Sequence, residues 1–213
     1  MTRVVEATGL VVRGTGRAGR PAVLDGIDIA MEAGTVTGLV GPSLSGKTTL
    51  LSILAGWEPP DEGRVTWQAG PKPGWDDLTV IPQGFALLDE LSVEENVRLP
   101  ERVGGRAIDP HRLAAVTEAI GIAHLLGRFT SEISVGERQR TMAARALVGE
   151  PGCILADDPV AHQDERHAGD VLRLLRAAAD RGAACLVATR TPALVVGVAD
   201  TIVHLGVERF PPR

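Results

Sequence analysis

The chain has 213 residues, of which 44% are hydrophobic and 23% are charged, and its formal net charge is −5. This is enough apolar sequence for one well-packed domain, and the composition excludes the disordered, collagenous and disulfide-stabilised classes. The negative charge balance also argues against bulk electrostatic binding of nucleic acid. Both cysteines, Cys153 and Cys185, lie in apolar runs, as expected for reduced core residues.

The sequence contains no run of 18 uncharged apolar residues. The best candidate, residues 182–199, is interrupted by Arg190 and Pro192. A membrane role would therefore depend on a partner rather than on a span. The first ten residues lack the apolar core and small-residue cleavage site of a secretory signal, so we expect a cytoplasmic protein.

Short apolar strands alternate with amphipathic helices, which predicts an α/β fold with a largely parallel sheet. Val4–Val12 and Ala22–Met31 are β-like, and Thr35–Val40 is a buried strand that leads into a glycine-bearing loop. The apolar helix Lys47–Ala55 follows, and Gly56 is placed to end it. The next twenty residues are rich in proline and glycine, which predicts turns and a hairpin.

The second half of the chain begins with a short strand, Leu78–Pro82, and then becomes helical until about residue 149. Two further strands, Cys153–Ala156 and Ala184–Thr189, flank a helix at about 165–181. A helical excursion between two α/β stretches indicates an inserted subdomain. We therefore interpret residues 1–213 as a single domain, with a core of 1–84 and 151–213 and a helical subdomain of 85–150.

A phosphate-binding loop follows the third strand. Residues 41–48 fit the motif G-x-x-x-x-G-K-[ST] in the strand–loop–helix context that the motif requires. Its glycines let backbone N–H groups surround phosphate oxygens, while Lys47 reaches the β and γ phosphates and the Thr48 hydroxyl binds Mg²⁺. The nucleotide-binding residues expected from the motif are Gly41, Pro42, Ser43, Leu44, Ser45, Gly46, Lys47, Thr48 and Thr49.

The second half of the site is predicted by an acidic pair, Asp157 and Asp158, which ends an apolar strand. The first acid would hold Mg²⁺ and the second would orient or deprotonate the attacking water. Acids at strand ends also cap helices, so this pair alone leaves both roles open. Gln83, the helix opening at residues 133–140 and Asp164 supply the remaining polar groups.

In their identity and order these motifs resemble those of the ATP-binding subunit of an ABC transporter, over the range Val4–Leu205. The sequence Glu-Arg-Gln-Arg at residues 137–140 is similar to the lipoprotein-release and macrolide-export type. The resemblance implies an α/β P-loop NTPase fold. It also implies a RecA-like core, an N-terminal antiparallel β-subdomain and an inserted α-helical signature subdomain.

The resemblance further implies a head-to-tail homodimer or heterodimer with a second ABC ATPase chain, with ATP bound between the P-loop of one chain and the signature of the other. The implied signature is Ser134, Val135, Gly136 and Glu137, and Asp164 is the implied D-loop acid. Thr48, Gln83 and Asp157 would hold Mg²⁺. Asp158, Gln83 and Arg190 would act on the γ-phosphate and water.

The implied partner is a separate integral-membrane permease that contacts a groove near residues 83–99. This would place the chain in the cytoplasm, peripheral on the inner face of the cell membrane. No nucleic-acid partner is expected. The transported substrate cannot be inferred, because selectivity belongs to the permease.

Four positions depart from the family pattern. Asp158 replaces a glutamate, Arg190 a histidine and Val135 a glycine, and no aromatic residue precedes Trp57 to stack on adenine. Arg13 or Arg17 could replace that aromatic by a cation–π contact. We expect the three tryptophans, which follow the P-loop, to be packing residues.

Three of these changes concern the γ-phosphate, and we hypothesise that hydrolysis is weakened. A carboxylate displaced by about 1 Å can lose a hundredfold in rate. The alternatives are a slow but working ATPase, and a non-hydrolysing regulatory half of a heterodimer. A cassette ATPase of DNA repair or translation is disfavoured, because those proteins usually carry tandem cassettes or coiled-coil insertions.

Overall fold

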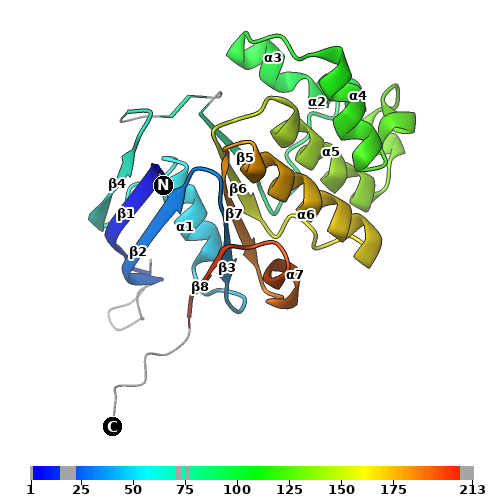
Figure 1. Ribbon diagram of the computed structural model, residues 1–213. Helices are drawn as coiled ribbons and strands as arrows, with labels where there is room; N and C mark the ends of the chain where they lie inside the picture. The colour runs from blue at the N-terminus through cyan, green and yellow to red at the C-terminus, as the bar shows by residue number, and fades with distance from the viewer. Residues whose placement is uncertain (1, 15–22, 71–72, 75–76, 207–213) are drawn as a thin grey trace.

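The computed structural model describes residues 2–14, 23–70, 73–74 and 77–206, which form two sheets and a group of helices (Figure 1). The antiparallel sheet has the order β2-β1-β4, and the parallel sheet has the order β5-β6-β7-β3-β8. The strands are β1 (Arg3–Val12), β2 (Leu24–Glu32), β3 (Val36–Val40), β4 (Glu62–Trp67), β5 (Leu78–Ile81), β6 (Cys153–Asp157), β7 (Ala184–Thr189) and β8 (Thr201–His204).

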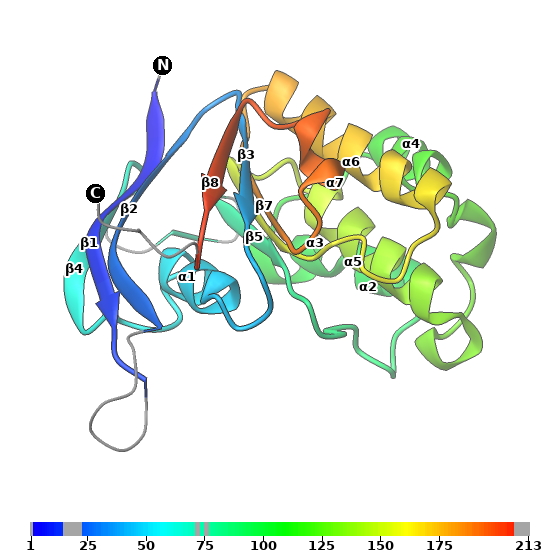
Figure 2. The same ribbon diagram turned by 90° about the horizontal axis from the view of Figure 1, so that it is seen from below.

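The helices are distributed on both faces of the parallel sheet. Figure 2 shows α1 between the two sheets, and α5 and α6 on the opposite face of the parallel sheet. The helices are α1 (Lys47–Leu54), α2 (Val93–Val97), α3 (Leu99–Gly104), α4 (Pro110–Ala119), α5 (Val135–Val148), α6 (Glu165–Asp180) and α7 (Ala193–Val196). Two short 3₁₀ turns, Ala123–Leu125 and Thr130–Glu132, lie between α4 and α5.

The core has two apolar layers, separated by the parallel sheet. Every residue of β3, β6 and β7 is buried, as expected for parallel strands covered on both faces. Leu155 and Leu186 face the layer formed with α1 and the antiparallel sheet, whereas Ile154 and Cys185 face the layer formed with α5 and α6. Cys153 and Cys185 therefore belong to different layers, and both are free thiols.

The parallel arrangement brings the carboxyl ends of β3, β6 and β7 to one edge of the sheet. Val40 pairs with Thr189 and Asp157 pairs with Ala188, so these three strands end at the same level. Ligands of open α/β sheets bind outside this edge. The loop after β3, the acids Asp157 and Asp158 at the end of β6, and Arg190 after β7 consequently meet there.

The α/β fold and the antiparallel sheet agree with the sequence-based prediction. The first helix ends at the C-cap residue Ala55, and Gly56 follows with φ of +71°, as expected for a glycine stop. Trp67 is buried, as expected for a packing residue, but Trp57 is 63% exposed, so the prediction that Trp57 is a packing residue is wrong. Trp75 lies outside the described residues. No helix in the described part of the chain is both long and apolar enough to span a bilayer.

Candidate nucleotide site

The loop between β3 and α1 can be formed only with glycine at both of its ends. Gly46 has φ of +92°, and a Cβ atom there would lie 2.7 Å from the Val23 carbonyl oxygen. A Cβ atom at Gly41 would lie 2.6 Å from the Leu205 carbonyl oxygen. The neighbouring backbone leaves no room for a larger residue, so these two glycines fix the loop beside β2 and the end of β8.

Lys47 occupies the inside of this loop. Its side chain is 8% exposed, and its Nζ donates hydrogen bonds of 2.8 Å to the carbonyl oxygens of Gly41 and Pro42. Burial lowers the pKa of Lys47, although the nearby Asp157 and Asp158 carboxylates oppose the shift. The ammonium group is thus held at the mouth of the glycine loop, where a phosphate oxygen could replace its carbonyl partners.

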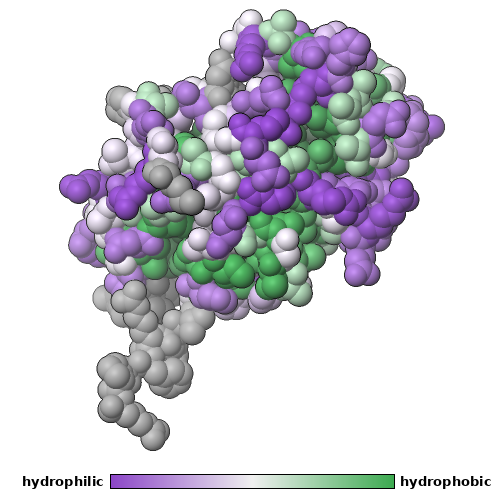
Figure 3. Space-filling view, viewed as in Figure 1, coloured by the Kyte–Doolittle hydropathy of each residue, from purple (hydrophilic) through white to green (hydrophobic). Residues whose placement is uncertain are grey.

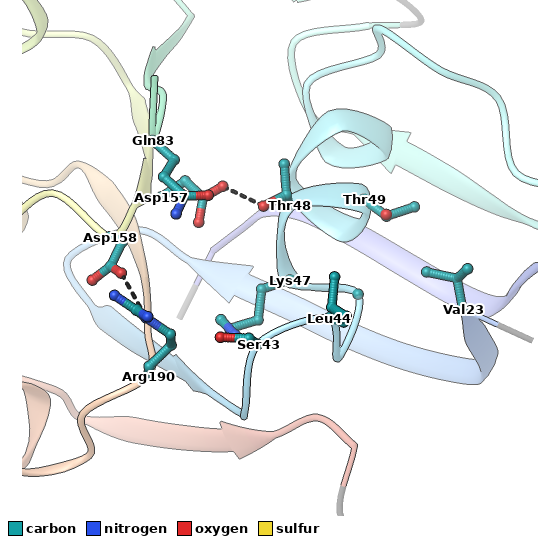
Figure 4. A pocket seen from close by; sticks show the side chains of 11 residues that line it. Val23, Ser43, Leu44, Lys47, Thr48, Thr49, Gln83, Asp157, Asp158 and Arg190 are labelled. Atoms are coloured by element: carbon teal, nitrogen blue, oxygen red, sulfur yellow. Dashed lines mark hydrogen bonds and ion pairs between the residues drawn. The ribbon is translucent and has the colours of Figure 1, made fainter. Parts of the chain in front are cut away.

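Thr48 and Asp157 join the loop to the end of β6. The Thr48 hydroxyl donates a 2.6 Å hydrogen bond to Asp157 Oδ2, as Figure 4 shows. Asp157 is 4% exposed, and burial raises the pKa of its carboxyl group while the Thr48 hydrogen bond lowers it. A hydroxyl and a carboxylate at this separation, with the Gln83 side chain beside them, are hard oxygen donors of the kind that Mg²⁺ prefers.

Asp158 is held in an unusual conformation next to Asp157. Its φ is +49°, in the left-handed region, and its N–H donates a 2.8 Å hydrogen bond to the Ala188 carbonyl oxygen of β7. The Arg190 Nε atom lies 3.3 Å from Asp158 Oδ2, and the Thr189 hydroxyl lies 3.5 Å from Oδ1. Only 8% of the Asp158 side chain is exposed, so this carboxylate is enclosed by the end of β7.

A cavity of about 450 Å³ connects these groups. Its lining residues are Val23, Ser43, Leu44, Gly46, Lys47, Thr48, Thr49, Gln83, Asp157, Asp158 and Arg190. The structure therefore brings together most of the predicted loop residues, both acids, Gln83 and Arg190. Leu44 was expected only as a loop residue, but it has φ of +66° and a fully exposed side chain.

The predicted signature residues lie on α5, outside the lining of this cavity. Ser134 is the N-cap of α5: its N–H donates to Glu137 Oε2 at 2.7 Å, and its hydroxyl accepts from the Glu137 N–H at 3.3 Å. Val135 is 49% exposed, and Gly136 follows it in the first turn. Asp164 likewise caps α6, accepting a 2.9 Å hydrogen bond from the His167 N–H. Both segments have sound structural roles as helix caps.

A buried amide network that the sequence did not predict joins the signature helix to the loop before α6. Gln163 Nε2 donates to the Gly136 carbonyl oxygen at 2.8 Å, and Arg140 donates to Gln163 Oε1 at 2.8 Å. Gln139, which is 1% exposed, donates to the Asp158 carbonyl oxygen at 3.0 Å and accepts from the His162 N–H at 3.1 Å. The only available sequence signal was two polar residues among apolar positions of α5.

Arg13, suggested as a partner for adenine, forms an exposed ion pair with Glu62, and its backbone N–H donates to Asp61. Arg17 lies outside the described residues. The aliphatic Val23, 37% exposed, is the only β2-side residue that lines the cavity among the described residues. A cation–π contact with the base therefore remains a prediction.

Comparison with known proteins identifies the family. The family model described as "ABC transporter" matches residues 24–161, which is more than half of the chain and includes the glycine loop, the signature segment and both acids. The chain belongs to the ABC transporter family.

Two curated relatives show that this family assignment holds over most of the chain. A lipoprotein-releasing system ATP-binding protein LolD from Xanthomonas oryzae pv. oryzae is 34% identical over 187 residues, covering 82% of this chain and 76% of the relative. A hemin import ATP-binding protein HmuV from Streptomyces coelicolor is 40% identical over 199 residues, covering 88% of this chain and 70% of the relative. One name denotes release and the other import.

Solved ABC cassettes share the fold. A structure described as the ATP-binding subunit of an ABC transporter superposes with a TM-score of 0.85 at 23% identity, covering 95% of this chain and 85% of that chain. A dimeric cassette in a post-hydrolysis state, bound to ADP and Pi, has a TM-score of 0.83 at 22% identity and covers 94% of both chains. The P-loop NTPase α/β fold of this ABC cassette is thus confirmed.

Proposed function

We propose that this ABC ATPase binds ATP with Mg²⁺ in the cavity at the carboxyl edge of its parallel sheet. The observation that carries the proposal is the 2.6 Å hydrogen bond between Thr48 and Asp157, next to the glycine loop that holds Lys47. A strand–loop–helix turn of this kind presents its N–H groups and helix N-terminus to phosphate oxygens.

Each residue has a defined task in the proposed complex. Lys47 transfers its hydrogen bonds from the two loop carbonyls to the β and γ phosphates. Thr48, Asp157 and Gln83 hold the magnesium ion, which neutralises phosphate charge when it is bound. Asp158 orients the attacking water, and Arg190 adds a permanent positive charge beside the γ-phosphate.

Hydrolysis at this site is weakened. Asp158 is one methylene shorter than the usual glutamate, and its carboxylate is already paired with Arg190 at 3.3 Å. The contact with Arg190 occupies Oδ2, one of the two oxygen atoms with which this carboxylate could accept a proton from water. Arginine also cannot exchange a proton at neutral pH, whereas the histidine usual at this position can.

A second chain completes the site. Ser134, Val135, Gly136 and Glu137 lie on α5 at an exposed helix N-terminus, and they are proposed to contact the ATP of a partner in a head-to-tail dimer. The exposed Asp164 segment would lie at the same interface. A homodimer and a heterodimer with a sister cassette both satisfy this arrangement. In either dimer, the Val135 side chain leaves less space between the helix backbone and the partner's γ-phosphate than a glycine would.

The membrane partner is proposed to dock in an apolar groove of about 510 Å³. The groove lies between β5, the end of α1 and the helical subdomain, and it includes Ala86 and Leu99 from the predicted contact segment 83–99. The half-exposed Trp57 supplies its largest apolar side chain. Docking of a permease here places the chain on the inner face of the cell membrane. The names of the two relatives denote different substrates and opposite directions of transport. We therefore assign the choice of substrate and direction to the permease.

The deciding experiment separates ATP binding from turnover. The purified chain with its permease should retain Mg-ATP, and Lys47→Ala should abolish retention. Single-turnover measurements then distinguish the slow ATPase from the alternative, a non-hydrolysing regulatory half of a heterodimer. A slow ATPase converts its bound ATP to ADP, and Asp158→Asn abolishes this conversion. A regulatory half converts no bound ATP. Failure of the unsubstituted chain to retain ATP would refute the proposal.

A further inference from the structure

A second charged cavity lies at the opposite edge of the parallel sheet from the nucleotide site. It has a volume of about 470 Å³ and is formed where α5 and α6 end and where β6 and β7 begin. Its charged lining residues are three arginines, Arg106, Arg112 and Arg181, and one acid, Glu150. In Figure 3, a band of hydrophilic residues crosses the surface over α6, with more apolar residues beside it over α4. The described lining therefore carries two positive charges in excess.

Arg112 is less exposed than Arg181: 21% of its side chain is exposed, against 44% for Arg181. One of its terminal nitrogens donates a 2.9 Å hydrogen bond to the Leu147 carbonyl oxygen at the end of α5. Its Nε atom is buried and makes no hydrogen bond. Burial lowers the pKa of Arg112, and the nearby Arg181 charge lowers it further. A buried donor without a partner is costly, so a ligand that accepted from Nε would be stabilised.

Glu150 does not satisfy the arginines around it. Its Oε1 atom lies 3.5 Å from Arg112 Nε and also 3.5 Å from Arg181 Nε, so it stands between two guanidinium groups without a short hydrogen bond to either. Glu150 itself has φ of +50°, an unfavourable backbone conformation for a side-chain-bearing residue. Arg106 has no ion pair within the described part of the chain.

We propose that this arginine cavity is a binding site for a phosphate group. Guanidinium groups bind phosphate through paired, charge-assisted hydrogen bonds, and the tetrahedral oxygens can accept from several arginines at once. Capping of α5 accounts for one terminal nitrogen of Arg112. It accounts neither for Nε, which has a 3.5 Å ion-pair contact with Glu150 but no hydrogen bond, nor for the two further arginines that line the same cavity.

The cavity is placed so that phosphate groups from two sources can reach it. A small recess lined by Arg106 and Arg112 adjoins it, and Pro100 lines both this recess and the apolar groove. Surface thus continues from the proposed permease groove to the arginines. An anionic lipid headgroup at the membrane face and a soluble phosphate compound present the same chemistry, and both can reach this edge of the molecule.

The test uses inorganic phosphate and a chain whose P-loop cannot respond to it. In the full-length Lys47→Ala protein, replacing chloride by phosphate at constant ionic strength should raise the melting temperature by about 3–5 °C at ten times the dissociation constant. Arg106→Gln/Arg181→Gln removes two exposed charges from the cavity and should abolish this rise. Arg64→Gln/Arg173→Gln removes two arginines elsewhere on the surface and should preserve it.

The unsubstituted chain saturated with Mg²⁺ and a non-hydrolysable ATP analogue, which fills the γ-phosphate position, provides a second background in case Lys47→Ala folds poorly. Flotation with phosphatidylglycerol vesicles, compared with phosphatidylcholine vesicles, identifies the source of the phosphate group. Binding to phosphatidylglycerol vesicles that the cavity variant loses indicates a lipid headgroup. A response to phosphate without vesicle binding indicates a soluble phosphate compound. A cavity variant that responds to phosphate as strongly as its parent, or a parent without a response, overturns the proposal. Neither result depends on ATP hydrolysis or on the permease.

Discussion

Arg190 Nε lies 3.3 Å from Asp158 Oδ2, which joins the two residues that we predict to replace the usual histidine and glutamate of the family. Both changes affect the same contact, because aspartate is shorter than glutamate by one methylene and arginine is longer than histidine. Thr189 supports the same carboxylate from the end of β7. Asp158 and Arg190 are therefore a matched pair, and substituting one alone leaves the other without its partner.

We expect the double variant Asp158→Glu/Arg190→His to hydrolyse ATP faster than the natural chain, by about tenfold to a hundredfold. The glutamate advances the carboxylate toward the water, and the histidine frees it from a permanent cation. The measurement is steady-state ATPase activity in the presence of the membrane partner. Each single variant is the control and should gain less than the pair. Wild-type turnover at or above that of the double variant contradicts the expectation.

Leu44→Gly should stabilise the nucleotide-free chain. A left-handed backbone conformation destabilises the folded state by about 1–2 kcal/mol when the residue carries a side chain, and glycine would remove this strain. Glycine also makes the unfolded chain more flexible, which offsets about 0.4–1 kcal/mol of that stabilisation. No packing is lost, because the Leu44 side chain is fully exposed. Urea unfolding should therefore show a net gain of about 0.5–1 kcal/mol. Leu44→Ala keeps the strain and should show no gain; equal effects of the two substitutions would rule out this explanation.

The pH dependence of stability should reveal the cost of burying Asp157. Its folded pKa is raised by burial, so between the unfolded and folded values the native state holds a proton that the unfolded state has lost. Stability consequently falls as the pH rises through that interval, and the loss persists at neutral pH. Asp157→Asn retains an acceptor for Thr48 and should stabilise the chain by about 1 kcal/mol at pH 7. The gain should shrink below the unfolded pKa; a destabilised variant at pH 7 would contradict this.

The fold and the nucleotide site were predictable because their signals are local and chemically specific. A glycine loop has few other uses between a strand and an apolar helix, and parallel strands place their following loops on one edge. The Gln163 contacts were not predictable, since nothing in a loop glutamine indicates that it will reach Gly136. Likewise, tryptophan is a residue type that usually packs in a core, so the exposure of Trp57 was not predictable. It follows from the three-dimensional path of the chain after α1, which places Trp57 in the lining of the apolar groove.

Gln163→Leu should loosen the first turn of the signature helix. The substitution keeps the side-chain size but removes the hydrogen bonds to Gly136 and Arg140, and the Nε atom of Arg140 already lacks a partner. We expect a loss of about 1–3 kcal/mol in stability, because a buried guanidinium is left unsatisfied. Equilibrium dialysis should show unchanged ATP affinity of the isolated chain, while ATP-dependent dimerisation weakens. An equal loss in both measurements would indicate only general destabilisation.

Trp57→Ala tests the groove without disturbing the nucleotide site. The side chain is 63% exposed and lines the apolar groove together with Leu99 and Ala86, so its removal costs little folding energy but takes the largest apolar surface from the proposed docking site. Co-purification with the permease should fall at least tenfold, since buried tryptophans commonly contribute 2 kcal/mol or more to an interface, on the order of a typical hot spot. Val196→Ala, at a similarly exposed residue outside the groove lining, is the matched control. If Trp57→Ala retains ATP and binds the permease as well as the unsubstituted chain does, the permease docks on another surface of the chain.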